Sequence, residues 1–184
     1  NVLNNKIAEN PSRLESQDHQ EYEFEEKERL VNIVAFCLMP NHFHLLLHER
    51  TKGGISKFMQ RLGIAYSLYF NEKYERSGAL FQGKYKYKII EDETYLTHLI
   101  NYIHLNPKDL MRKSGTLKQT LEFLSNYPWS SYNDFCDVKK YSHLLQTKSA
   151  CKTINLTNSY AESIIEACED NNSIADSIPD LLLD

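Results

Sequence analysis

Two short apolar runs separated by a turn constrain the fold of this chain more than any other feature. Leu30–Leu38 reads LVNIVAFCL and is apolar on both alternating faces, which is typical of an interior strand. Met39-Pro40-Asn41 follows, and because Pro40 cannot continue a central strand, a turn is predicted there. His42–His48 is the second apolar stretch. The pattern therefore predicts a β-hairpin over residues 30–48.

Two helices and a further strand are predicted after the hairpin. Apolar residues recur every three or four positions over Ile55–Tyr69, with Lys57 and Arg61 placed away from the apolar face. A second helix is expected over Asp92–Leu105, with its first residue as the N-cap. Between them, Leu80–Ile90 alternates apolar or aromatic residues with polar ones, which predicts a strand. Its polar face carries Lys84, Lys86 and Lys88, and we expect Tyr85 and Tyr87 to pack in the core.

Length and composition indicate one folded domain of ordinary size. The chain has 184 residues, of which 41% are hydrophobic and 25% charged, a balance that excludes a disordered tail. No apolar run reaches the roughly 18 residues that a membrane span needs, so no membrane partner is expected. Four cysteines without a C-x-x-C pair favour a reduced, cytoplasmic compartment.

Charge is distributed unevenly along the chain. The whole sequence has a net charge of −4. Residues 50–90 hold nine basic and two acidic residues, which is a net charge of +7 and leaves −11 for the rest. Such an asymmetry is what a basic binding face on an acidic protein produces, although a solvated surface of uneven charge fits the same counts.

The sequence His42-Phe43-His44 is the first candidate for chemistry. Side chains alternate along a strand, so the two histidines share one face while Phe43 points to the other. We expect Leu45 and Leu47 to join Phe43 on the core face. Two imidazoles at these positions are suited to one divalent metal ion; the alternative is a pair of partly buried, hydrogen-bonded histidines.

The second candidate is the pair Tyr102 and Asn106. The two residues are four apart on the predicted helix and are therefore neighbours on its surface. They lie to one side of the expected core stripe, which consists of Leu96, Ile100 and Ile103. A tyrosine placed there can attack a phosphodiester, and the amide oxygen of asparagine can complete a metal site. Taken alone, the same residues fit a packed tyrosine and a helix end before proline.

Three motifs in order resemble the single-tyrosine HUH transposases of insertion sequences. They are Cys37–Leu47 (CLMPNHFHLLL), Leu80–Lys84 (LFQGK) and Tyr102–Pro107 (YIHLNP). The element Trp129-Ser130-Ser131-Tyr132 brings the chain nearest to the REP-associated branch of that family. The resemblance covers residues 31–132, and its motifs are highly specific.

The resemblance implies an α+β fold with an antiparallel sheet of ferredoxin-like or RRM-like character and helices packed on one face. It implies cleavage and rejoining of single-stranded DNA beside a hairpin, through a 5′-phosphotyrosine and a free 3′-hydroxyl. Tyr102 matches the nucleophile, and His42, His44 and Asn106 match the ligands of Mg²⁺ or Mn²⁺. Phosphate contacts are expected from Lys57, Arg61, Lys84, Lys86 and Lys88.

Family members usually begin with a strand and a helix that residues 1–20 do not show. We therefore expect this front piece to be absent and the strand over residues 30–38 to keep an unpaired edge. The chain divides into a polar segment over residues 1–29, a catalytic domain over 30–132 and a partly helical extension over 133–184. The resemblance leaves a monomer and a homodimer open, and places the protein at the nucleoid.

A relaxase or replication initiator would share the chemistry of the transposase but is usually larger. Two other classes of function compete with it. A histidine-triad nucleotide hydrolase needs a third alternating histidine, but Leu46 occupies that position. A catalytically silent protein that binds single-stranded or hairpin DNA would keep the basic face without metal-dependent cleavage.

Overall fold

The computed structural model describes residues 29–91, 93–111, 115–136, 138, 140–146 and 160–169. The elements in chain order are β1 (Val31–Leu38), β2 (Phe43–Glu49), α1 (Gly54–Lys73), α2 (Glu93–Leu105), η3 (Asn106–Leu110), α3 (Leu117–Asn126), α4 (Tyr132–Phe135) and α6 (Tyr160–Glu169). The sheet is antiparallel, so the expected α+β class is confirmed. The expectations for residues 1–28, for the Asp92 cap and for much of the C-terminal extension lie outside the described residues.

The predicted hairpin is confirmed, with β1 beginning one residue later than expected. Cys37 pairs with His44 near the turn, and the Met39 N–H donates to the His42 carbonyl oxygen over 2.8 Å. This backbone bond closes the turn that the proline predicts. His42 is therefore the last residue of the turn, and His44 is the second residue of β2.

The other edge of β1 is covered by segments from the C-terminal half of the chain. The Ser131 N–H donates to the Phe36 carbonyl oxygen over 3.0 Å, and the Gln146 N–H donates to the Ile33 carbonyl oxygen over 2.9 Å. The expectation of an unpaired edge is therefore wrong for this part of β1. Backbone far along the sequence supplies hydrogen bonds that a neighbouring strand would otherwise supply.

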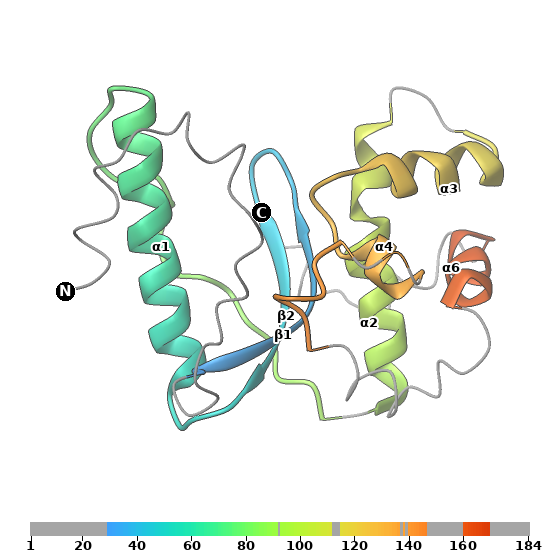
Figure 1. Cartoon of the computed structure of the whole chain (residues 1–184), viewed down its shortest axis with the longest axis horizontal. Coiled ribbons are helices and arrows are strands. Elements are labelled where there is room, and N and C mark those ends of the chain that lie inside the picture. The colour runs from blue at the N-terminus through green and yellow to red at the C-terminus, as the bar shows by residue number, and fades with distance from the viewer. Residues whose placement is uncertain are drawn as a thin grey trace.

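The hydrophobic core lies on the face of the hairpin that carries His44 and Leu46. Figure 1 shows α2, α3, α4 and α6 grouped on this side. Ile100 and Ile103 of α2 are 1% and 3% exposed and pack with Leu46, as the predicted core stripe requires. The expectation of helices on one face thus holds for the elements that build the core.

The opposite face of the hairpin is occupied by α1 (Figure 1). We expected Phe43, Leu45 and Leu47 to face the core, and this is wrong: they are only half-buried on the α1 side, where Phe43 lies 6.0 Å from Phe81, ring centre to ring centre. The alternation was predicted correctly, but the larger group of helices packs on the histidine face instead.

The helix predicted over Ile55–Tyr69 is confirmed and is longer at both ends. Lys57 and Arg61 are exposed, as expected. Its apolar side is covered only in part, since Tyr66 and Tyr69 remain about half exposed. No helix in the described part of the chain is long and apolar enough to cross a membrane.

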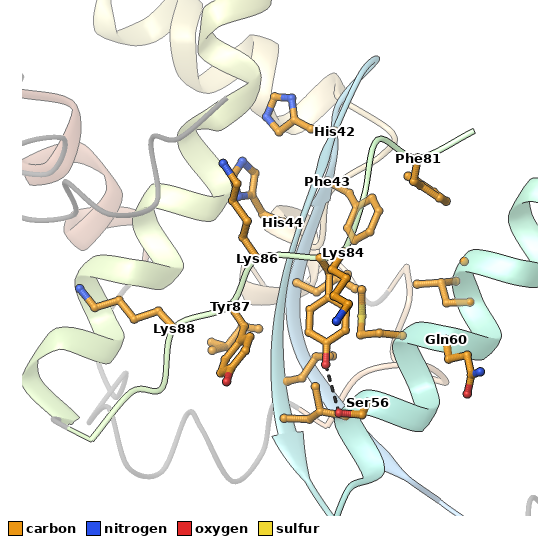
Figure 2. Close-up of a pocket in the computed structure, with 18 of the residues that line it drawn as sticks. His42, Phe43, His44, Ser56, Gln60, Phe81, Lys84, Lys86, Tyr87 and Lys88 are labelled. Carbon is orange, nitrogen blue, oxygen red and sulfur yellow. Dashed lines mark hydrogen bonds between the residues drawn. The ribbon is translucent and has the colours of Figure 1, made fainter. Parts of the chain in front are cut away.

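The strand predicted over Leu80–Ile90 is wrong. The segment has no ladder to another described strand, and Figure 2 shows it crossing β2 from the α1 side at Phe81 to the α2 side at Lys88. A strand forms only where a backbone partner runs alongside it, and this segment runs across the hairpin instead. The expected packing of Tyr85 and Tyr87 in the core is also wrong, because their side chains are 38% and 76% exposed.

Candidate active site

Three rings from two elements lie in a row beside the hairpin. The ring centres of His42 and His44 are 5.0 Å apart, and those of His44 and Tyr102 are 5.5 Å apart. Both pairs meet nearly edge to face, at 89° and 80°. The structure therefore brings together the two histidines of the hairpin and the tyrosine of α2, as the sequence motifs predict.

Local structure explains how these side chains meet. His42 is exposed at the end of the turn, where its Nδ1 lies 2.8 Å from the Asn41 side-chain oxygen. His44 points from β2 toward α2, because that is the face on which the helix packs. Tyr102 lies on the side of α2 next to the core stripe, which keeps it half-buried beside His44.

Asn106, the first residue of η3 directly after α2, joins the same cluster. Its Nδ2 donates to the Tyr102 carbonyl oxygen over 2.8 Å, one turn earlier in the chain. The Asn106 side chain also raises the pKa of His44 and lowers that of Tyr102, in each case against the larger effect of burial. The carboxamide oxygen is the atom of Asn106 that can serve as a metal ligand.

His44 is held in its neutral form at pH 7. Burial, with a smaller contribution from His42, lowers the pKa of His44 to about 4, against an opposing effect of Asn106. Its Nε2 is buried and has no hydrogen-bond partner among the described residues. A neutral imidazole with an unused ring nitrogen is the form that binds a metal ion.

Tyr102 is a phenol at pH 7. Burial raises the pKa of Tyr102, Asp109 and Tyr95 raise it further, and Asn106 acts in the opposite direction. Any reaction that uses this oxygen as a nucleophile must remove its proton and favour the phenolate.

A buried hydrogen-bond network around His104 joins α2 to the elements packed against it. The Nδ1 of His104 lies 2.5 Å from the Tyr160 hydroxyl, and its Nε2 lies 2.7 Å from Ser131 Oγ. Ser131 Oγ in turn accepts from the Phe36 N–H of β1 over 2.9 Å. His104 thus connects α2 to α6 and, through Ser131, to β1.

The sequence interpretation missed the role of His104. The residue lies inside the Tyr102–Pro107 motif, but its partners are 27 and 56 residues away in the chain. Two signals could have found it: its position one turn after Ile100 in the core stripe, and the polar Ser130-Ser131 pair in an otherwise bulky motif.

A groove of about 2430 Å³ surrounds the three rings. It is lined by α1, β2, residues 78–91 and α2, and it is larger than the roughly 300–1,000 Å³ of a small-molecule pocket. The basic residues expected to bind phosphate divide into two groups. Lys84, Lys86 and Lys88 line the groove, whereas Lys57 and Arg61 lie on exposed positions of α1 outside it.

The lysines do not form the single face that a strand would give. Figure 2 shows the Lys86 side chain running toward the His44 ring, while Lys84 lies on the α1 side of β2. The Nζ of Lys88 lies 5.1 Å from the centre of the Tyr95 ring at the start of α2. The three cations are thus spread along the groove.

The described residues contain no group of three or more His, Cys, Asp or Glu side chains that could hold a metal ion. A metal ion in this groove would need the amide oxygen of Asn106 in addition to His42 and His44. The unused Nε2 of His44 fits such a ligand set.

Comparison with known proteins identifies the family. No curated protein and no solved structure matches this chain. A family model described as "Transposase IS200 like" matches residues 5–106, which is more than half of the chain and includes all three rings and Asn106. The chain belongs to the IS200-like transposase family.

Proposed function

We propose that this protein cleaves and rejoins single-stranded DNA, with Tyr102 as the nucleophile and a hairpin beside the cleavage site. Within the family, we place it in the REP-associated branch because of the Trp129–Tyr132 element. The observation that carries the proposal is the row of rings His42, His44 and Tyr102 within one groove.

The proposed reaction balances without any cofactor that stores energy. The Tyr102 oxygen forms a bond to the phosphorus, and the bond from phosphorus to the 3′ oxygen breaks. The phenol loses one proton and the released 3′ oxygen gains one. Because a tyrosyl phosphodiester replaces a DNA phosphodiester, a second 3′-hydroxyl can reverse the step and join strands.

His42, His44 and Asn106 would hold a divalent ion, Mg²⁺ or Mn²⁺, next to Tyr102. Such an ion would polarise the scissile phosphate and stabilise the charge that develops on it. The chain's own residues prepare this site: burial keeps His44 unprotonated, and Asn106 contacts both His44 and Tyr102. The ring contact between His44 and Tyr102 lies within one copy of the chain, which supports a site built by a single subunit.

Lys84, Lys86 and Lys88 would bind the DNA backbone along the groove. Lysine contacts to phosphate set the position of a strand without reading its sequence. Lys86 extends from the crossing segment toward His44, where the scissile phosphate would lie (Figure 2).

The proposal is tested by covalent trapping. The wild-type protein is incubated with single-stranded hairpin DNA and Mn²⁺, and a protein–DNA adduct is expected on a denaturing gel. Tyr102→Phe should give no adduct while its DNA affinity stays within a few-fold of wild type, because binding depends on the groove lysines. Tyr95→Phe is the matched control on the same helix and should keep the adduct.

Two results would contradict the proposal. An adduct that persists in Tyr102→Phe and disappears in Tyr95→Phe would move the nucleophile to Tyr95. DNA binding without any adduct in the wild type would indicate a silent DNA-binding protein.

A further inference from the structure

The segment over residues 83–90 exposes aromatic and aliphatic side chains that a folded protein normally covers. Tyr87 is 76% exposed and Ile89 is 71% exposed. Both lie on the stretch that crosses β2 without a strand partner, and both line the groove that contains the candidate active site. Exposed apolar side chains that line the same groove as a candidate active site are suited to a ligand that covers them.

The ring of Tyr87 lies next to a second tyrosine ring from the same segment. Its ring centre lies 6.0 Å from that of Tyr85, at an interplanar angle of 48°. Tyr85 is fixed in turn by its hydroxyl, which lies 3.2 Å from Ser56 Oγ at the start of α1 (Figure 2). The Tyr87 ring is therefore supported on one side and open on the other.

Positive charge alternates with these rings along the chain. Lys84, Lys86 and Lys88 flank Tyr85 and Tyr87, and residues 76–90 contain no acidic side chain. Lys86 runs toward His44, so the basic groups continue from the aromatic pair to the candidate active site (Figure 2). Rings between lysines match a single nucleic acid strand, whose bases stack on aromatic faces while its phosphates contact cations.

We propose that Tyr87, supported by Tyr85, is a stacking platform for a base of single-stranded DNA next to the scissile phosphate. This inference rests on the proposed function for the identity of the strand, but it concerns binding rather than cleavage. Charge complementarity favours a polyanion over a second copy of this acidic protein or another protein as the occupant. Stacking tolerates any base, so the platform would add affinity without sequence preference.

The test compares two oligonucleotides of equal charge without divalent metal. One is an oligothymidine of about 15 nucleotides, and the other has the same backbone with abasic sites. Binding is measured by fluorescence anisotropy for the wild type, Tyr87→Ala and Tyr87→Phe. Tyr69→Ala is the control, because Tyr69 is 53% exposed on α1 and does not line the groove.

The wild type should bind the oligothymidine about 5- to 100-fold more tightly than the abasic strand, the range expected for one stacked base. Tyr87→Ala should remove this preference by weakening only the binding of the oligothymidine. Tyr87→Phe and Tyr69→Ala should keep the preference. All variants should keep the wild-type circular dichroism spectrum, since both side chains are exposed.

Three results would overturn the inference. The first is a wild type that binds the oligothymidine and the abasic strand with equal affinity. The second is a Tyr87→Ala variant that loses affinity equally for both strands. The third is a dimeric wild type that becomes monomeric in Tyr87→Ala, which would make this face an interface between copies. Covalent trapping is measured separately, so it can still succeed or fail when the stacking platform is disproved.

Discussion

Two histidines of this protein are kept neutral by burial, and they differ in their hydrogen bonds. The buried Nε2 of His44 has no hydrogen-bond partner among the described residues, whereas both ring nitrogens of His104 have partners. Burial lowers the pKa of His44 to about 4 and that of His104 to about 3. In the unfolded chain both return to the ordinary value near 6.5. Protonation therefore favours the unfolded chain at acid pH.

The pH dependence of stability follows from these two shifts. Because both folded pKa values are lower than the unfolded ones, the stabilisation is fully present above pH 6.5 and is lost as the pH falls toward 4. Two extra protons on the unfolded chain predict a slope of about 2 to 3 kcal/mol per pH unit near pH 5. Urea denaturation of the wild type and of His44→Gln at several pH values measures the change in the free energy of unfolding per pH unit. The variant should show about half the wild-type change. Equal slopes would show that His44 is protonated in the folded protein.

Metal binding is predicted at His42 and His44. His42→Ala and His44→Ala should each remove Mn²⁺ binding measured by calorimetry, because each takes away one nitrogen ligand. His42 is exposed, so its replacement should change the free energy of unfolding by less than about 0.5 kcal/mol. His48→Ala, an exposed histidine at the far end of β2, is the control and should bind Mn²⁺ as the wild type does. Unaltered Mn²⁺ binding in both variants would mean that these histidines are only structural.

Among the elements, the hairpin and α2 were predictable from the sequence, and the crossing segment was not. The periodicity of β1, β2 and α2 is local information that each stretch contains. Alternation over Leu80–Ile90 is equally clear, but a strand also needs a partner backbone, which the pattern does not encode. The hydrogen bonds that later segments make to the outer edge of β1 were missed for a related reason, because Ser131 lies 95 residues after Phe36.

The hydrogen bonds between Ser131 and the edge of β1 lead to a prediction about this serine. Its Oγ accepts from the buried Phe36 N–H and lies next to His104 Nε2, so Ser131→Ala leaves two buried polar groups without a partner. We expect a loss of about 2 to 4 kcal/mol in the free energy of unfolding, together with faster hydrogen exchange of the Phe36 amide.

The control for this change is Ser125→Ala on the exposed side of α3, where the hydroxyl donates to the Glu122 carbonyl oxygen. It should cost less than about 0.5 kcal/mol. Equal stability of the two serine variants would show that the hydrogen bonds of Ser131 contribute little to joining β1 and α2.

For the molecule as a whole, the proposed DNA path depends on how the positive charge is distributed. The basic residues of positions 50–90 separate into Lys84, Lys86 and Lys88 in the groove and others outside it, such as Lys57 and Arg61. The sequence alone predicted a basic region, but it could not distinguish these two groups, because that depends on which way α1 faces.

The salt dependence of DNA affinity distinguishes the two groups. Each phosphate that is neutralised on a single strand contributes about −0.7 to the slope of log K against log salt. Replacing Lys84, Lys86 and Lys88 together by Gln should flatten the slope by about 2, and replacing Lys57 and Arg61 by Gln should leave it unchanged. The reverse pattern would place the DNA on the outer side of α1.

The central claim is that Tyr102 forms a covalent bond to DNA, and the most direct measurement is mass spectrometry of the trapped adduct. After nuclease and trypsin digestion, the modified peptide should run from Ile89 to Lys108 and carry the 5′ phosphate of the cleaved strand. This peptide contains both Tyr95 and Tyr102, so fragment ions must locate the phosphate. We predict that it lies on Tyr102; a phosphate on Tyr95, or on a peptide outside this range, would contradict the account.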